Sequence, residues 1–225
     1  MKSEQEVQDA ARAIISFTDS YTQNRKREQN EQSKSNPSFV YIVSTLQSLE
    51  NQIRNNYSRK SVIQIPKLLH SLAILVTLRL GTRLREEIDQ QIFTIRHWSR
   101  ECLRQIQFFG DEQDQTELVN IRYGRIMPIL ISTAGGVGEE QDEAIYNGLN
   151  HIQQFLRQLH KGRNEWKPYF QPLPLLFRRT EEQIEEEGAS EEIEAQMKNS
   201  RYYGYIKICA NLANDTTLNR FFHKS

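Results

Sequence analysis

Residues 65–80, IPKLLHSLAILVTLRL, decide the fold class because they form the most apolar stretch of an otherwise polar chain. A membrane-spanning helix needs about 20 mostly apolar residues, but the uninterrupted apolar run covers only residues 72–76, and charged residues flank it. The stretch is long for a β-strand, and no turn signal divides it. On a helix, its apolar side chains cover most of the circumference, so other helices must enclose it. We therefore predict an internal helix of an all-α protein, with no membrane partner.

The segment that follows, residues 84–109, predicts a second and longer helix. Its stripe recurs at steps of three and four residues and consists of the apolar residues Leu84, Ile88, Ile92, Ile95, Leu103 and Ile106, with the small Ser99 between them. Between the two helices, Gly81 suits a helix C-terminus and Thr82 suits an N-cap. Because the connection is so short, we expect the two helices to lie side by side as a helical hairpin.

On the N-terminal side of this hairpin, the pattern predicts a helix, a linker and another helix. Residues 5–21 carry an amphipathic stripe, whereas residues 24–36 contain no apolar residue and cannot offset their ordering entropy by burial. The next helix begins at Pro37, and its buried side is expected to hold Phe39, Val40, Ile42, Val43, Leu46, Leu49 and Ile53. We divide the chain into an N-terminal helix (1–22), a mobile polar linker (23–37) and a helical domain (38–225).

On the C-terminal side, helices alternate with loops. We interpret residues 110–117, GDEQDQTE, as a loop. Its acidic side chains do not indicate a calcium site, because their spacing lacks the central glycine and distal glutamate of an EF-hand. Helices are expected at 118–123, 126–132, 139–162, 175–187, 190–198 with Ser190 as N-cap, and 203–222. The prolines of residues 163–174 forbid a continuous helix. We expect the aromatic side chains of this connector, Trp166, Tyr169 and Phe170, to pack against the preceding helix.

The composition of the chain argues against several classes of function. The chain has 29 Lys and Arg against 29 Asp and Glu, which argues against an extended nucleic-acid footprint, because that needs a net basic surface. The hydrophobic fraction of 37% is below the globular average and suggests a thin, extended fold. Cys102 and Cys209 are interpreted as reduced core thiols, and the N-terminus lacks the apolar run of a secretory signal. We expect a cytoplasmic location, with the nucleus as the alternative.

No catalytic, metal or cofactor motif stands out. The histidines form no metal-ligand pair of the His-Glu-x-x-His kind. His97 and Cys102 lie about 140° apart around one helix and do not face each other as base and nucleophile. The glycine-rich residues 134–138 precede Glu139 and Glu140, which would repel a phosphate. We therefore predict a protein that is not an enzyme and needs no cofactor.

Two segments of the second half are alike. Gly124 in residues 120–132 and Gly188 in residues 185–197 occupy equivalent places. Each segment ends one helix at glycine, begins a short helix and then enters a long one. Repetition of a helix triplet is typical of an α-solenoid, in which each unit buries its faces only against its neighbours.

On these residues the chain resembles the armadillo-repeat family, because the sequence IPKLL at 65–69 also echoes IMPIL at 126–130. The resemblance covers about residues 58–222. It implies a short right-handed α-solenoid of about three degenerate three-helix units, preceded by the N-terminal helix and linker. A HEAT-like or unclassified helical array is the alternative.

The resemblance also implies where a partner binds. In armadillo proteins the third helices line a concave groove, where an Asn two residues after a core Leu grips an extended peptide. That position falls on Gln105, His151 and Asn214, of which only Asn214 keeps the residue type. The aromatic residue that often precedes the core Leu is replaced by Glu101, Asn147 and Ala210.

From the residues themselves, Trp98 with its neighbours Arg96, His97 and Arg100 is a candidate contact patch, with Trp98 in the core as the alternative. The candidate partner-binding residues are thus Trp98, Gln105, Asn147, His151 and Asn214. We expect a scaffold that binds a protein segment on the concave face of its third helices. The alternative is a compact helical bundle that serves as a structural or oligomerising subunit.

Overall fold

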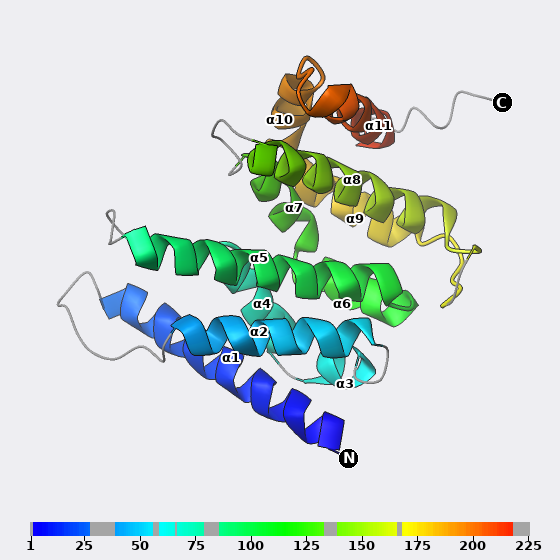
Figure 1. Ribbon diagram of the computed structural model, residues 1–225. Coiled ribbons are helices and arrows are strands. Elements are labelled where there is room, and N and C mark those ends of the chain that lie inside the picture. Colours follow the sequence, from blue (N-terminus) through cyan, green and yellow to red (C-terminus); the bar gives the residue numbers. More distant parts are fainter. Residues whose placement is uncertain are drawn as a thin grey trace. The chain divides into compact units, whose positions relative to one another are not determined.

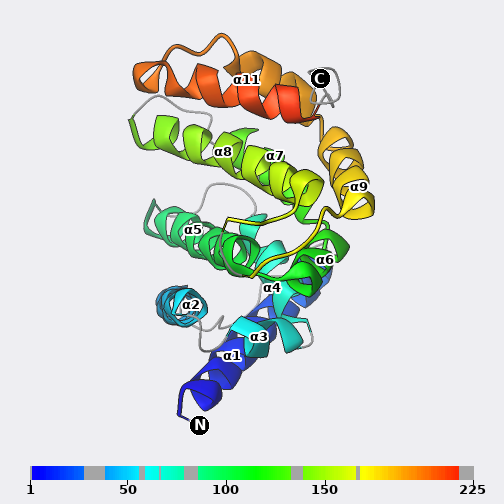
Figure 2. The ribbon, with the colours of Figure 1, turned by 90° about the vertical axis from the view of Figure 1, so that its right-hand side faces the viewer.

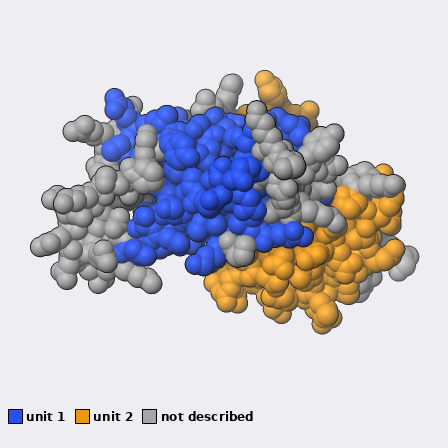
Figure 3. All heavy atoms as spheres, turned by 90° about the horizontal axis from the view of Figure 1, so that it is seen from below, with its two compact units in different colours: residues 1–110 blue, residues 111–225 orange. Residues whose placement is uncertain are grey.

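The computed structural model describes residues 2–27, 39–55, 59–65, 67–78, 86–132, 139–165 and 168–217. These residues are helical apart from turns, loops and one isolated β-bridge, so the predicted all-α class is confirmed. The chain forms two compact units, residues 1–110 and residues 111–225 (Figure 3).

The first unit contains five helices among its described residues (Figure 1). They are α1 (Lys2–Arg27), α2 (Phe39–Arg54), α3 (Arg59–Gln64), α4 (Leu68–Val76) and α5 (Glu86–Phe109). Helices α2 and α4 both pack against α5, and α1 packs against α2 and α4. The core between them includes Ile14, Phe17, Ile42, Leu46, Leu49, Leu68, Leu72, Leu75, Ile95, Leu103 and Ile106, all almost fully buried.

Most side chains of α4 are buried as predicted, although His70 is exposed, and the described part of the stretch at 65–80 is not one continuous helix. Helix α4 covers only Leu68–Val76, and α3 ends before it at Gln64. Ile65 precedes a proline, which disfavours the α conformation at that position, and Lys67 has a positive φ of 69°. Helix α5 confirms the second predicted helix, and its contact with α4 confirms that the two are neighbours. Gly81 and Thr82 lie outside the described residues.

Two expectations for the N-terminal helices need correction. Helix α1 runs on to Arg27, past the expected end at residue 22, while residues 28–37 of the expected linker lie outside the described residues. Val40 was expected on the buried side of α2 but is 61% exposed. It stands about 200° around the helix from Ile42, whose side of α2 is buried.

The second unit is built around the long helix α8 (Glu139–Lys161). The other helices described in it are α6 (Glu112–Asn120), α7 (Tyr123–Ser132), α9 (Pro174–Glu185), α10 (Ala189–Gln196), the 3₁₀ helix η1 (Tyr202–Gly204) and α11 (Tyr205–Thr217). Figure 2 shows α8 beside α11, and α7 and α9 also pack against α8. The predicted inward face of α8 is confirmed, because Ile145, Leu149, Ile152, Leu156 and Leu159 are all buried.

The interpretation of residues 110–117 as a loop was wrong. Helix α6 begins at Glu112, and the acidic side chains that suggested a loop form its N-terminal capping box. The Asp111 carboxylate accepts from the Asp114 N–H at 3.2 Å, and the Asp114 carboxylate accepts from the Asp111 N–H at 2.8 Å. This reciprocal pair satisfies two amides that a helix start would leave open.

Contacts between Arg163 and Phe170 hold the connector after α8 in place. Their backbones form a bridge with N–O distances of 2.8 and 3.2 Å, and the Arg163 guanidinium lies 4.7 Å from the centroid of the Phe170 ring. Phe170 is buried as expected, but Tyr169 is exposed, and Trp166 lies outside the described residues. Ser190 is not the N-cap of α10, because Gly188 holds that position.

One local geometry recurs in three places. Lys67, Arg122 and Gly188 have φ values of 69°, 62° and 69°, and each stands immediately before a short helix, α4, α7 or α10. In each case another helix precedes the left-handed residue, and a longer one, α5, α8 or α11, follows the short helix. The expected equivalence of Gly124 with Gly188 is therefore wrong. Gly124 lies inside α7, and Arg122 occupies the equivalent position.

Candidate protein-binding surface

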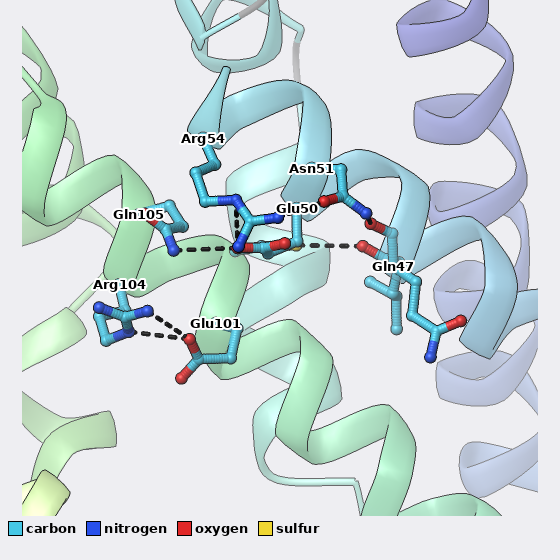
Figure 4. A network of polar contacts seen from close by, with 9 residues as sticks. Gln47, Glu50, Asn51, Arg54, Glu101, Arg104 and Gln105 are labelled. Carbon is cyan, nitrogen blue, oxygen red and sulfur yellow. Dashed lines mark hydrogen bonds and ion pairs between the residues drawn. The ribbon is translucent and has the colours of Figure 1, made fainter. Parts of the chain in front are cut away.

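Arginines at four-residue steps form one side of α5, which we call the arginine face (Arg96, Arg100 and Arg104). Residues four apart lie on the same side of a helix, and all three side chains are half-buried. The Nε of Arg96 donates to the carbonyl oxygen of Leu78 at 2.7 Å, which ties α5 to the chain just beyond α4. Arg104 donates twice to the Oε2 atom of Glu101, at 2.8 and 2.6 Å (Figure 4).

Arg100 differs from the two arginines beside it. Its guanidinium makes no hydrogen bond and no ion pair in the part of the chain that the structure describes. Burial lowers the pKa of Arg100, the charge of Arg96 lowers it further, and Glu101 opposes the change. The arginine face therefore contains a cation that has lost part of its water without gaining a hydrogen bond or ion pair from the described residues.

Behind this face, a buried polar pair joins α5 to α2. The Nε2 of Gln105 donates to the Oε1 of Glu50 at 2.9 Å, and both residues are buried. Figure 4 shows the two side chains meeting between the helices, with Arg54 on the same carboxylate at 3.9 Å. The Cys102 thiol contacts the Leu46 carbonyl oxygen at 3.6 Å. These contacts show that α2 and α5 run in the same direction, with Cys102 beside Leu46 and Gln105 beside Glu50.

His97 and Trp98 lie beside the arginine face. Their rings meet edge to face with centroids 5.1 Å apart, and His97 is exposed while Trp98 is half-buried. Partial burial of its ring lowers the pKa of His97, the charges of Arg100 and Arg104 lower it further, and Glu101 and Glu50 act against them. His97 is therefore held toward its neutral form by its surroundings.

The candidate residues from the sequence fall in both units. Trp98 and Gln105 lie on α5, and the Gln105 amide is used by Glu50 rather than turned to solvent. On α8, Asn147 is exposed and His151 is half-buried. Asn214 of α11 is buried. The structure thus leaves Asn147 exposed and Trp98 and His151 partly exposed, whereas Gln105 and Asn214 lie within their units.

A second exposed surface, which the sequence reasoning missed, is a tyrosine cluster in the second unit. Tyr202 lies 5.4 Å from Tyr146 and 6.3 Å from Tyr205 between ring centroids, and Tyr203 is 94% exposed. Tyr202 and Tyr203 both have positive φ values, of 53° and 55°. The dense run of tyrosines in RYYGY, residues 201–205, was the signal that could have identified it.

The described residues contain no group of three or more His, Cys, Asp or Glu residues that could hold a metal ion. Cys102 and Cys209 are buried free thiols, and burial raises the pKa of each, which disfavours the reactive thiolate. Across the same ranges, no helix has both the length and the apolar character needed to cross a membrane.

Comparison with known proteins adds no family. No family model matches the chain, and no curated protein matches it. Functional inference therefore depends on the geometry of the two units and on the surfaces they expose.

Proposed function

We propose that the protein is a non-enzymatic scaffold that binds a segment of a partner protein along its long helices. The observation that carries this proposal is the recurring left-handed residue at Lys67, Arg122 and Gly188, each before a short helix that leads into a longer one. A helix triplet that recurs in this way is the building block of helical-repeat proteins, which use extended surfaces to bind partners. The resemblance to armadillo repeats points the same way.

The surface of the first unit supports this role. Val40 and Tyr41 of α2 and Phe93 of α5 are exposed although they are large and apolar. The parallel register of α2 and α5 places Phe93 near the start of α2, because Leu46 lies opposite Cys102. Such exposed apolar side chains, mixed with charged ones, are common at sites of protein interaction.

The grouping of the helices into repeat units is part of the same proposal. We propose a short right-handed α-solenoid whose units are α3–α4–α5, α6–α7–α8 and α9–α10–α11, with binding on the long helices. Trp98, Asn147 and His151 are then candidates for partner contact, while Gln105 joins α5 to α2 and Asn214 is buried. Small-angle scattering is the test of this shape. An elongated, curved particle supports the solenoid, and a globular particle contradicts it.

The binding role is tested by selecting peptides from an unbiased display library on the full chain. Hydrogen exchange with the best peptide then shows which backbone amides become protected. We expect protection on α2, α5, α8 or α11. Failure to select any peptide, or protection confined to the short helices α3, α4, α7, α9 and α10, would contradict the scaffold.

The alternative of an oligomerising subunit has one observation in its favour. Tyr205, Ile208 and Leu212 are exposed at spacings that place them on one side of α11. An apolar helix side of this kind can pair with a second copy. Analytical ultracentrifugation at several concentrations distinguishes the two roles, because the oligomerising subunit requires self-association and the scaffold does not.

A further inference from the structure

We infer that the arginine face of α5 docks an acidic segment of the partner protein, with a partner carboxylate forming an ion pair with Arg100. The inference rests on the proposed scaffold function and names the chemistry of the segment that the scaffold binds. It follows from three features of the face. Arg100 has no hydrogen bond or ion pair among the described residues, two nearby carboxylates already have partners, and Phe93 is exposed on the same side of the helix.

The first feature is the state of the Arg100 guanidinium. It is half-buried and makes no hydrogen bond or ion pair with the residues that the structure describes. Removing a charge from water without a partner is unfavourable. A guanidinium has five N–H donors in a planar fork that fits a carboxylate with two parallel hydrogen bonds. A carboxylate of a partner protein would supply the hydrogen-bond acceptors and the negative charge that the described residues do not provide to Arg100 in a direct contact.

The second feature is that two acidic residues in this part of the unit, Glu101 and Glu50, already have hydrogen-bond partners. Glu101 receives both hydrogen bonds of Arg104 on its Oε2 atom. Glu50 is buried and accepts from Gln105. The charge of Glu101 acts on Arg100, but neither carboxylate forms an ion pair with the Arg100 guanidinium among the described residues, so a partner carboxylate can bind there.

The third feature is the pattern along the helix. Successive arginines of the face are roughly 6 Å apart along the axis of α5, because each residue rises about 1.5 Å. Alternate residues of an extended chain are roughly 6.7 Å apart and point the same way. Phe93 is 54% exposed and lies on the same side of α5, seven residues before Arg100. The face therefore matches an extended segment with acidic residues at alternate positions and an apolar residue at one end.

A protein segment fits this face better than a nucleic acid. Phosphate binding draws on an extended basic surface, whereas this chain has 29 basic and 29 acidic residues. Glu101 stands directly beside the arginines, and Glu87 is exposed near the start of the same helix. Both would repel a continuous phosphate backbone, while a peptide can place its carboxylates only where the arginines lie.

The test uses the full chain and three labelled probes, followed by fluorescence anisotropy. The first is a peptide of about eight residues in which Glu alternates with Thr and Val and which ends in Leu, long enough to follow the roughly 12 Å from Arg96 to Arg104. The second has Gln in place of every Glu. The third is a single-stranded oligonucleotide with the same number of negative charges. We expect the Glu peptide to bind and the other two to bind at least about tenfold more weakly, as loss of charge-assisted hydrogen bonds predicts.

Variants then assign the binding to Arg100. We expect Arg100→Gln to weaken binding of the Glu peptide by about tenfold or more, and Arg100→Lys to weaken it less. Arg178→Gln is the matched control, because Arg178 is an exposed arginine on α9 of the other unit, and it should leave binding unchanged. The NMR signal of the Arg100 Nε–H group in the unaltered protein provides a measurement independent of any variant. It should shift when the Glu peptide is added.

Several results would overturn the inference. They are absence of Glu-peptide binding up to about 1 mM, equal binding of the Gln peptide, tighter binding of the oligonucleotide, an unshifted Arg100 signal, or equal losses in Arg100→Gln and Arg178→Gln. Peptides selected from the unbiased library separate this failure from failure of the scaffold. Neutral or basic peptides that protect the long helices would keep the scaffold and defeat the acidic docking.

Discussion

The side chain of Gln183 bridges the junction between α6 and α7, and Gly124 is the residue that leaves room for it. The Nε2 of Gln183 donates to the Val119 carbonyl oxygen at 3.0 Å, and its Oε1 accepts from the Gly124 N–H at 3.1 Å. One buried amide of α9 thus satisfies the end of one helix and the start of the next. Gly124 was singled out in the sequence as a repeat marker, but its role in the structure is this close approach.

We predict that Gly124→Ala destabilises the second unit. A Cβ at position 124 would lie 2.8 Å from both Cβ and Oε1 of Gln183 and 3.1 Å from the Thr180 carbonyl oxygen. Helix α9 would have to move away, at a cost of about 2 kcal/mol, partly offset by the better helix propensity of alanine. Urea unfolding measures the loss. Gln171→Ala, on an exposed glutamine outside the helices, is the control, and equal stability of Gly124→Ala and the unaltered protein would refute the close approach.

At the three left-handed positions, replacing a side chain with glycine should stabilise the protein, whereas replacing glycine with alanine should destabilise it. Lys67→Gly and Arg122→Gly should each stabilise the folded protein by about 0.5 kcal/mol. Glycine adopts the left-handed conformation without the steric cost of a Cβ atom, and this gain exceeds the stability lost because glycine raises the entropy of the unfolded chain. Gly188→Ala should destabilise by about 1 kcal/mol. The new Cβ would meet only the Glu191 Oε2 atom, at 3.4 Å, so this loss reports the backbone rather than a clash. Unfolding midpoints in urea measure all three changes, and destabilisation by either glycine would contradict the shared geometry.

The buried pair of Glu50 and Gln105 predicts a non-additive pair of mutations. Gln105→Leu removes the 2.9 Å hydrogen bond to a buried carboxylate and should destabilise the first unit by about 2 kcal/mol. The double variant Glu50→Leu with Gln105→Leu should regain much of this loss, because replacing both partners with apolar groups leaves no unsatisfied charge. Chemical denaturation of both single variants and of the double variant gives the interaction free energy of the two side chains. Additive losses would show that the two side chains do not interact.

The lowered pKa of His97 predicts weaker stability in acid. As the pH falls through the ordinary value of 6.5, the unfolded chain takes up the His97 proton before the folded chain does. The unfolded state then binds more protons, so His97 reduces the free energy of unfolding below about pH 7 and has no such effect well above it. His97→Gln should lessen the acid loss, measured by urea unfolding across pH 5 to 8.

NMR titration tests the cause of that shift directly. Because the Arg100 charge lowers the pKa of His97, Arg100→Gln should raise it, whereas Arg178→Gln in the other unit should leave it in place. A His97 pKa that is unchanged in Arg100→Gln would mean that the Arg100 charge does not contribute to the shift, which would then come from burial and the remaining charges.

Much of the helical architecture could be predicted from the sequence, because burial imposes a period on the apolar residues. Ile145, Leu149, Ile152, Leu156 and Leu159 recur at helical spacing, and all of them are buried on α8 as expected. The long helix α5 and its pairing with α4 follow in the same way. Hydrophobic periodicity is local information, and it needs no knowledge of what lies opposite.

Only the tertiary structure decided how polar and special backbone positions are used. The acidic residues at 110–117 have the composition of a loop, but Asp111 and Asp114 cap α6. Gln105, which the resemblance placed in a groove, pairs with Glu50 instead, and the tyrosine cluster forms only when η1 is folded against α8. Hydrogen bonds and ion pairs depend on which side chains meet across helices, so they follow from packing and not from the spacing of residues along the chain.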